Sequence, residues 1–512
     1  MGYREYDIKV PVSSGEEELK LIIRKKTGIR NFTYLILRKS LDARNKNNIV
    51  WLYRVGLRSK HIRSGHPAII PILRTERKNR EEHILIAGSG PAGLFSALYL
   101  AESGYRITLI ERGNRVEERK TSLDLFEAGG TFDPANNYAF GEGGAGTFSD
   151  GKLTSRTKSI RSERNYIYSQ LIHLGAPEEI SYMTHPHLGT DNLFRITLNF
   201  RNRLEELGCR LLYNTPLLDL KIKNKRICAA ETRQGLIEAD RFIVATGHSS
   251  FDTYRMLIRA KIPFRTKNFA LGFRSEHRQQ IINLAQWGVP DLPGVKAAEY
   301  RLTTDTPDKT SVYSFCMCPG GRVVPSMAYP STNIVNGMSY YRRDGPWANA
   351  AIVAGLNLEK MLKRNISAIE AIDWLENLET SFFNYTGDYK APACTIAGFL
   401  KKQSTGKLPD SSYPFPLVDA DFEELLPREI IPSLRYGLQN FCKKLKGYEE
   451  GIIIGLESKT SSPIQVEREN FSLWSGYPNL YIAGEGSGRA GGIISSAADG
   501  LRIALQILSE SR

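Results

Sequence analysis

Runs of apolar residues divide the chain into three regions. In residues 1–57 the runs are short, typical of strands, and surround a stretch with helical spacing at 15–26, which Gly28 is suited to close. Residues 58–82 are polar and basic and contain two prolines, so we interpret them as a linker. Residues 1–57 are therefore predicted to form a small basic α+β module, joined by this linker to the rest of the chain.

From residue 83 onward, buried strands alternate with helical patterns. Residues 83–104, HILIAGSGPAGLFSALYLAESG, read as an apolar strand, a glycine turn and a helix. Two distant segments also contain an apolar strand that ends in a glycine turn: RFIVATG at 241–247 and NLYIAGEGSGRAGG at 479–492. This arrangement predicts an α/β fold.

The turn at residues 88–93 has the G-x-G-x-x-G spacing of a dinucleotide-binding fingerprint. It follows a strand and opens a helix, and an acid, Glu111, comes about 20 residues later. Gly88 permits the tight turn, Gly90 lets a pyrophosphate approach the backbone, and Gly93 lets helix and strand pack closely. The helix N-terminus offers N–H groups and the positive end of its dipole to the phosphates. We predict an adenine dinucleotide site that includes Gly88, Gly90, Pro91, Ala92, Gly93, Glu111 and Arg112.

The spread of these segments along the chain favours FAD over NAD. An NAD domain is usually closed within one segment, whereas an FAD domain of the glutathione-reductase type is split, with its last strand and helix near the C-terminus. In that type the last strand ends in Gly-Asp, whose acid binds the ribityl chain, and here Glu485 stands in its place. We expect FAD as the tightly bound cofactor, with further contacts from Ala245, Thr246, Gly247, Gly484, Glu485, Gly491, Gly492 and Ile493.

Six blocks resemble a bacterial family of poorly characterised FAD-dependent dehydrogenases. They are FGEGGAGTFSDGKL, VATGHSSFDT, SFCMCPGGRVV, NGMSYYRRDG, ESKTSSPI and AGEGSGRAGGI, in one order within residues 81–512. The resemblance implies a split Rossmann-like FAD domain of the ββα, three-layer type, with an inserted α+β substrate domain. We expect the FAD domain at 83–255, with a connecting segment at 161–189, and at 450–512, and the inserted domain at 256–449. No particular substrate is implied.

The first block contains four glycines within six residues. Such a loop leaves backbone N–H groups unshielded, and a nest of this kind suits the electron-rich edge of a reduced flavin or the pyrophosphate. A flexible surface loop is the alternative. The predicted cofactor contacts in this loop are Gly143, Gly144, Ala145, Gly146 and Thr147.

A flavin carries the electron chemistry, so the protein mainly positions the substrate and supplies a proton. Tyr313, Tyr340 and His248 are the catalytic candidates, although two core tyrosines and a structural histidine would explain the same residues. Cys316 and Cys318 alternate on a predicted strand and should face one side, as a buried pair or as a redox pair.

No grouping of residues has the spacing of a metal site, and we predict none. His185 and His187 lie close together, but no acid or cysteine at metal spacing is near them. We interpret both histidines as loop or substrate-pocket residues.

Positive charge is concentrated at the N-terminus. Of the net charge of +14, residues 1–80 hold 19 Lys/Arg and 7 Asp/Glu, and the remainder hold 50 and 48. This asymmetry suggests an anionic partner, either RNA or an acidic protein, and a solvated basic face is the alternative. No apolar run approaches 18 residues, the N-terminus lacks a signal-peptide core, and six cysteines suggest a reducing compartment. We expect a cytoplasmic protein without a membrane span.

Three functions compete on these observations. The leading one is an FAD-dependent oxidoreductase that transfers hydride or electrons between a small molecule and FAD. NAD(P)H would be a transient donor in it, because no second dinucleotide fingerprint follows a strand. The second is an FAD enzyme that modifies RNA through the basic module, which steep salt dependence of binding would reveal. The third is a non-catalytic flavin-binding redox partner.

Overall fold

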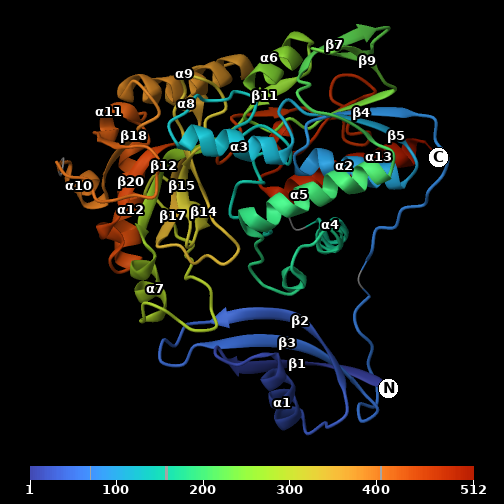
Figure 1. The fold of residues 1–512 in the computed structure, drawn as a ribbon. Coiled ribbons are helices and arrows are strands. Elements are labelled where there is room, and N and C mark those ends of the chain that lie inside the picture. The colour runs from blue at the N-terminus through green and yellow to red at the C-terminus, as the bar shows by residue number, and fades with distance from the viewer. Residues whose placement is uncertain (70, 156–158, 404–405, 512) are drawn as a thin grey trace.

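The computed structural model describes residues 1–69, 71–155, 159–403 and 406–511 (Figure 1). The N-terminal module is an antiparallel sheet of order β1-β3-β2 with one helix against it. Gly28 closes that helix with φ of +72°, as predicted. The elements of the module are β1 (Gly2–Pro11), α1 (Glu16–Thr27), β2 (Thr33–Asp42) and β3 (Val50–Ser59).

The module packs directly on the rest of the protein, below it in Figure 1. Ile49 is buried in the same apolar cluster as the core of the second domain. The Lys39 N–H donates to the Tyr182 carbonyl at 2.8 Å, and Lys46 Nζ donates to the Ala285 carbonyl at 2.7 Å. The module is therefore integrated into the fold rather than tethered by its linker alone.

The first large domain is built on a parallel sheet of order β22-β10-β4-β5-β6. Successive residues of the central strand point to opposite faces, because side chains alternate along a strand. Ile84 and Ile86 pack towards helices α2 and α13, and Leu85 and Ala87 pack towards a three-stranded sheet and helix α6. The domain therefore has three layers. The parallel strands are β4 (His83–Ala87), β5 (Arg106–Ile110), β6 (Arg210–Leu212), β10 (Arg241–Val244) and β22 (Leu480–Ile482).

Helices cover one face of this sheet, and the three-stranded antiparallel sheet covers the other. In Figure 1, α2 and α13 lie side by side beside α5. These outer elements are α2 (Pro91–Glu102), α3 (Val116–Glu127), α4 (Arg161–His173), α5 (Gly189–Glu206), α6 (Phe251–Arg259), α13 (Ile493–Glu510), β7 (Leu217–Lys223), β8 (Arg226–Thr232) and β9 (Gly235–Glu238).

The second domain is a sheet of order β13-β14-β17-β12-β20-β18-β19. Helices α9 (Ala368–Thr386) and α12 (Ile431–Lys444) contribute to the largest apolar core of the molecule. The strands are β12 (Phe269–Arg278), β13 (Thr303–Asp305), β14 (Ser311–Cys318), β17 (Trp347–Leu356), β18 (Ala391–Thr395), β19 (Leu417–Asp419) and β20 (Ile452–Glu457).

Strand β20 corrects one boundary. It pairs with β12 and β18 in the middle of the second sheet, whereas the sequence placed the second domain's end at residue 449. A buried apolar strand looks the same in either sheet, so only the pairing assigns it. The second domain therefore reaches to about residue 460, where the chain returns to the first domain through β21 (Ile464–Val466) and β22.

Candidate functional site

A cavity begins at the carboxyl ends of the parallel strands and continues into the second domain. In open α/β sheets ligands bind at these strand ends. Its wall on the side of the first domain contains most of the predicted cofactor contacts. These are Gly88, Gly90, Pro91, Ala92, Glu111, Arg112, Gly144, Ala145, Gly146, Ala245, Thr246, Gly247, Gly484, Glu485, Gly491, Gly492 and Ile493.

The three fingerprint glycines differ in what surrounds them. A Cβ at Gly88 would lie 2.5 Å from the Ala245 carbonyl oxygen, and one at Gly93 would lie 1.9 Å from the Gly88 oxygen, so both are required by packing. A Cβ at Gly90 meets only the Gly144 Cα, at 3.9 Å. The space above Gly90, at the N-terminus of α2, is therefore open. This is the cradle that a pyrophosphate needs.

Glu111 lies at the end of β5, where the ribose of a dinucleotide is expected. Its buried carboxylate accepts hydrogen bonds from the Ser89 N–H at 2.9 Å, the Gly113 N–H at 3.0 Å and the Gly141 N–H at 3.2 Å. Glu111 thus joins three loops of the cavity wall while lining the cavity.

The glycine-rich loop after residue 140 is held from behind by Arg119, which the sequence analysis missed. This fully buried guanidinium donates to the carbonyls of Asn137, Glu142 and Gly144, each at 2.9 Å. Burial lowers the pKa of Arg119 to about 10. The loop is therefore a fixed wall and not a flexible surface segment. Arg119 carries no recognisable signal in sequence, because it sits among other charged residues of α3.

Two residues of that loop are placed differently from the prediction. Gly143 and Thr147 pack inside the loop, where a Cβ at Gly143 would lie 2.0 Å from the Thr147 hydroxyl, and they do not line the cavity. The N–H groups of Gly144 and Thr147 are donated to carbonyls within the loop. The nest prediction is therefore wrong for these amides, because the turn uses them itself.

Glu485 and His248 form a hydrogen-bonded pair in the cavity wall. His248 Nδ1 lies 2.8 Å from Glu485 Oε2, and Nε2 lies 3.0 Å from the Lys459 carbonyl. The other oxygen of Glu485 accepts from the Gly492 N–H at 2.5 Å, at the start of α13. Burial favours the neutral acid, but His248 and this amide lower the pKa of Glu485. The longer acid thus reaches both the histidine and the helix end.

The structure places the two catalytic tyrosine candidates outside this cavity. Tyr313 packs against Val353 and other side chains of the second sheet, and Tyr340 is 53% exposed on a turn. Neither residue lines the cavity wall. A tyrosine near a family block need not face the site, since the strand and turn positions decide its direction, and a catalytic role gains no support here for either residue. Of the three candidates, His248 lines the cavity.

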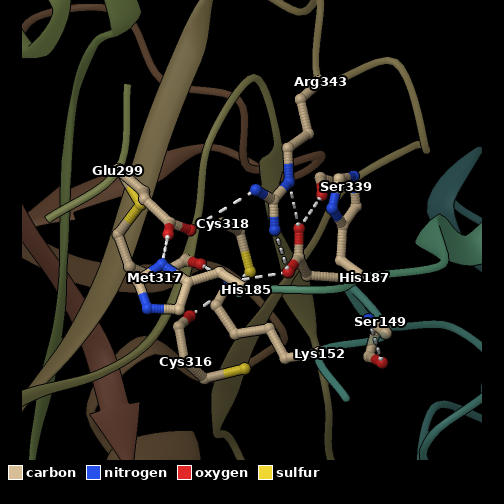
Figure 2. A network of polar contacts seen from close by, with 12 residues as sticks. Ser149, Lys152, His185, His187, Glu299, Cys316, Met317, Cys318, Ser339 and Arg343 are labelled. Carbon is tan, nitrogen blue, oxygen red and sulfur yellow. Dashed lines mark hydrogen bonds and ion pairs between the residues drawn. The ribbon is translucent and has the colours of Figure 1, made fainter. Parts of the chain in front are cut away.

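Asp150, which lies behind the cavity wall, holds two cations, and Figure 2 shows both of them, Lys152 and Arg343. Arg343 donates to Asp150 from Nε at 3.0 Å and from Nη2 at 2.7 Å, and Lys152 Nζ donates at 2.6 Å. Burial alone would raise the pKa of Asp150, but Arg343 and Lys152 lower it far below its usual value. The carboxylate is therefore ionised although its side chain is fully buried.

Lys152 brings this network to the cavity surface. Its ammonium also donates to the carbonyl of Met317, which leaves a third N–H for a ligand. Burial opposes the charge, but Asp150 raises the pKa of Lys152 above its usual value. Lys152 is thus a fixed cation at the far end of the cavity.

The two neighbouring histidines belong to the outer side of the same network and do not line the cavity. His185 Nδ1 lies 2.7 Å from Glu299, which in turn lies 3.4 Å from Arg343, and the His185 side chain is 67% exposed. Burial lowers the pKa of His187 to about 4, so it is neutral, and Nε2 lies 3.0 Å from the Tyr341 carbonyl. The loop interpretation holds for both, and the substrate-pocket interpretation does not.

The cysteine prediction fails at a bulge in β14. Pairing with β17 shifts register between Phe315 and Cys318, and Cys316 has φ of +45°. Cys316 therefore lines the cavity, while Cys318 is completely buried behind it, with Sγ 3.5 Å from Arg274 Nη2. Alternation along a strand holds only where the strand is regular.

The wall contributed by the second domain is mostly polar, and its two charged side chains are ion-paired. Its members are Phe315, Cys316, Ser326, Asn336, Glu457, Lys459 and Thr460. Arg274, fully buried, donates to Glu457 at 2.8 Å, and Lys459 lies 2.7 Å from Glu379. Sequence reasoning did not single out Lys152, Glu457 or Lys459. The signal was present, because all three stand inside the quoted blocks FGEGGAGTFSDGKL and ESKTSSPI.

Comparison with known proteins supports the cofactor assignment. Residues 82–280 match the family described as pyridine nucleotide-disulphide oxidoreductase, and residues 268–460 match the family described as FAD-dependent protein, C-terminal domain-like. The open cradle at Gly90, the split sheet and these matches define the class: the protein is an FAD-dependent oxidoreductase, and its cofactor is FAD. Residues around Gly90, Glu111 and Glu485 are those that fit the cofactor.

The particular family follows from a full-length relative. A protein of Clostridium beijerinckii, described as uncharacterized, is 36% identical over 495 residues, which cover 93% of this chain and 92% of that protein. The chain belongs to this family of FAD-dependent proteins.

Solved structures align more loosely. CtdE in complex with FAD is 12% identical over 83% of this chain and 84% of that chain, with a TM-score of 0.35. L-proline dehydrogenase from P. horikoshii is 13% identical over 85% and 95%, also with a TM-score of 0.35. The family assignment rests on the sequence matches.

Proposed function

We propose that the substrate is a small molecule bound in the far half of the cavity, between the glycine loops and the second domain, and that it exchanges hydride or electrons with FAD. One observation carries the proposal. The same continuous cavity is lined by the cofactor cradle at Gly90 and by Lys152, Cys316, Glu457 and Lys459. A ligand beside these four side chains would share one enclosed space with the flavin.

The charges of this half are balanced, which favours a polar substrate over a highly charged one. Lys152, Glu457 and Lys459 each have a buried counter-charge behind them, at 2.6 to 2.8 Å. Fixed donors of this kind orient a ligand oxygen without needing to reorganise. Bound FAD supplies the two-electron chemistry. The remaining N–H of Lys152 would then hold an oxygen of the substrate.

His248 is the residue we propose to hold a proton near the cofactor. It lines the cavity, and Glu485 fixes its ring from one side and the Lys459 carbonyl from the other. Since both ring nitrogens are engaged, proton exchange with a ligand requires Nε2 to leave the Lys459 carbonyl, while the carboxylate keeps the ring oriented.

We also propose NAD(P)H as a transient donor and the cytoplasm as the location. The six cysteines are all free, which suits a reducing compartment. No helix in the described part of the chain is long and apolar enough to cross a membrane. The RNA alternative gains no support, since the basic module packs on the body of the protein.

The test is a stopped-flow screen of flavin reduction in the FAD-loaded protein by NADH, NADPH and a panel of small metabolites. We expect one nicotinamide to reduce the flavin and at least one metabolite to reduce it or reoxidise it. In the Lys152→Met protein, the metabolite reaction should slow while FAD content stays unchanged, because Lys152 lies away from the cradle. Equal metabolite rates in both proteins would contradict the placement of the substrate.

A further inference from the structure

Cys316 stands out among the residues that the cofactor does not explain. It lines the cavity from the bulge in β14, and its backbone lies in the left-handed region at φ of +45°, which is uncommon outside glycine. The bulge turns Cys316 out of the regular alternation of the strand, while Cys318 remains fully buried. The chain thus presents one of the two thiols to the cavity.

Two cations hold this bulge in place: the buried Arg274, and Lys152, which lines the cavity and is shown with Met317 in Figure 2. Arg274 Nη2 donates to the Cys316 carbonyl at 2.7 Å, and Lys152 Nζ donates to the carbonyl of the next residue, Met317. The Cys318 thiol lies 3.3 Å from the same Cys316 carbonyl. The two cations that fix the backbone also act electrostatically on the Cys316 thiol.

These surroundings favour the thiolate. The neighbouring Cys318 thiol and the cations Lys152 and Arg274 outweigh burial and lower the pKa of Cys316 below its usual value, although the anions Asp150 and Glu457 oppose them. A thiolate next to cations, and open to a cavity, is the environment in which cysteines react.

We propose that Cys316 is a nucleophile of the substrate site and that the substrate is a carbonyl compound. The Cys316 sulfur forms a bond to the carbonyl carbon, the C=O π bond breaks, and its electron pair moves to the oxygen. That oxyanion lies beside the Lys152 ammonium, whose third N–H is free to donate to it. The addition is reversible, and nothing is oxidised or reduced in it. This inference rests on the proposed substrate site.

The experiment measures how fast iodoacetamide alkylates each cysteine of the FAD-loaded protein, by peptide mass spectrometry across pH 5 to 9. We expect Cys316 to react at least ~10-fold faster than Cys228 at pH 7, because the thiolate is the reactive form. Cys228 is an exposed cysteine and serves as the internal comparator. The Cys316 rate should level off below the usual pKa range of a thiol, because its pKa is lowered.

Three variants test whether the charge of Lys152, rather than substitution in general, sets the Cys316 rate. Lys152→Met should shift the pH profile of the Cys316 rate upwards by about one pH unit, and Lys152→Arg should leave the profile close to that of wild type. Lys120→Met removes an exposed lysine elsewhere and should change nothing. A Cys316 rate no higher than that of Cys228, or a pH profile that Lys152→Met leaves unchanged, would overturn the nucleophile.

Propanal tests the carbonyl class, with propan-1-ol as the matched control. We expect propanal to protect Cys316 from alkylation in a saturable way, while propan-1-ol does not. Equal protection by both, or by neither, would overturn the carbonyl assignment. Failure of the proposed function would show differently, as a flavin that no small molecule reduces or reoxidises while Cys316 still alkylates rapidly.

Discussion

At the residue scale, two glycines three positions apart have different duties. A Cβ at Gly90 meets no atom closer than 3.9 Å, whereas one at Gly93 would lie 1.9 Å from the Gly88 oxygen. Gly90→Ala should therefore leave the fold intact and weaken FAD binding, since the added methyl enters the pyrophosphate space. Gly93→Ala should lower the melting temperature instead. Calorimetry and flavin titration on both variants check this, and the reverse pattern would contradict the assignment.

Glu111 holds three loops of the cavity wall and is also the acid that we predict to bind the ribose. Glu111→Ala removes the acceptor of the Ser89, Gly113 and Gly141 amides, and with it this predicted ribose partner. We expect FAD affinity to fall ten- to a hundredfold, from charge-assisted bonds worth ~1.5–3 kcal/mol each. The melting temperature should fall too. Glu118→Ala, on the exposed side of α3, is the control. An unchanged dissociation constant would show that Glu111 does not serve the ribose.

A buried histidine makes stability depend on pH. Burial lowers the pKa of His277 to about 4, while Nε2 lies 2.8 Å from the Tyr448 carbonyl. Between pH 6.5 and 4 the unfolded chain binds a proton that the folded chain does not. The stability that neutral His277 provides is therefore complete above pH 6.5 and is lost as the pH falls, by about 1.4 kcal/mol per pH unit.

The measurement is urea unfolding at pH 7, 6 and 5. On acidification, the free energy of unfolding should fall more steeply for wild type than for His277→Gln. The difference between the two slopes should correspond to one proton bound on unfolding. His187, whose pKa is also lowered to about 4, adds the same sign in both proteins and does not affect the difference. Parallel pH profiles would show that His277 is not the group that resists protonation.

At the scale of elements, hydrogen bonds from Arg119 of α3 hold the glycine loop in place. Arg119 satisfies the carbonyls of Asn137 and Glu142, and leaving each of these acceptors unpaired costs ~1–3 kcal/mol. Arg119→Met should release the loop, lower the melting temperature and reduce FAD content together. Arg119→Lys should rescue only part, because an ammonium has three donors and no planar fork. A Lys variant equal to wild type would contradict this role.

The elements that could be predicted were those with a local signature. The fingerprint turn with its strand and helix, the split arrangement and the C-cap at Gly28 all follow from short-range patterns. The bulge at Cys316 depends instead on Arg274 and Lys152, which arrive from distant segments. The assignment of β20 depends on which strands flank it. Neither is encoded in a local period, so sequence reasoning placed both incorrectly.

At the scale of the whole molecule, deleting the N-terminal module tests whether its contacts stabilise the rest of the protein. Ile49 shares a core with the second domain, and burying one such side chain contributes roughly 1.5–3 kcal/mol. A protein of residues 81–512 should be less soluble, melt at a lower temperature and hold less FAD, as measured by gel filtration and the flavin-to-protein absorbance ratio. A truncated protein with unchanged melting temperature and flavin content would show that the contacts of the module are dispensable.

The central claim concerns the cradle above Gly90, and flavin stoichiometry tests it most directly. Purified wild type should contain one non-covalent FAD per chain, released by denaturation and identified by chromatography. Gly90→Asp should fold with the wild-type circular dichroism spectrum yet hold no flavin, because a side chain and a negative charge would fill the pyrophosphate position. A colourless wild type that refuses added FAD, or a fully loaded Gly90→Asp protein, would contradict the account.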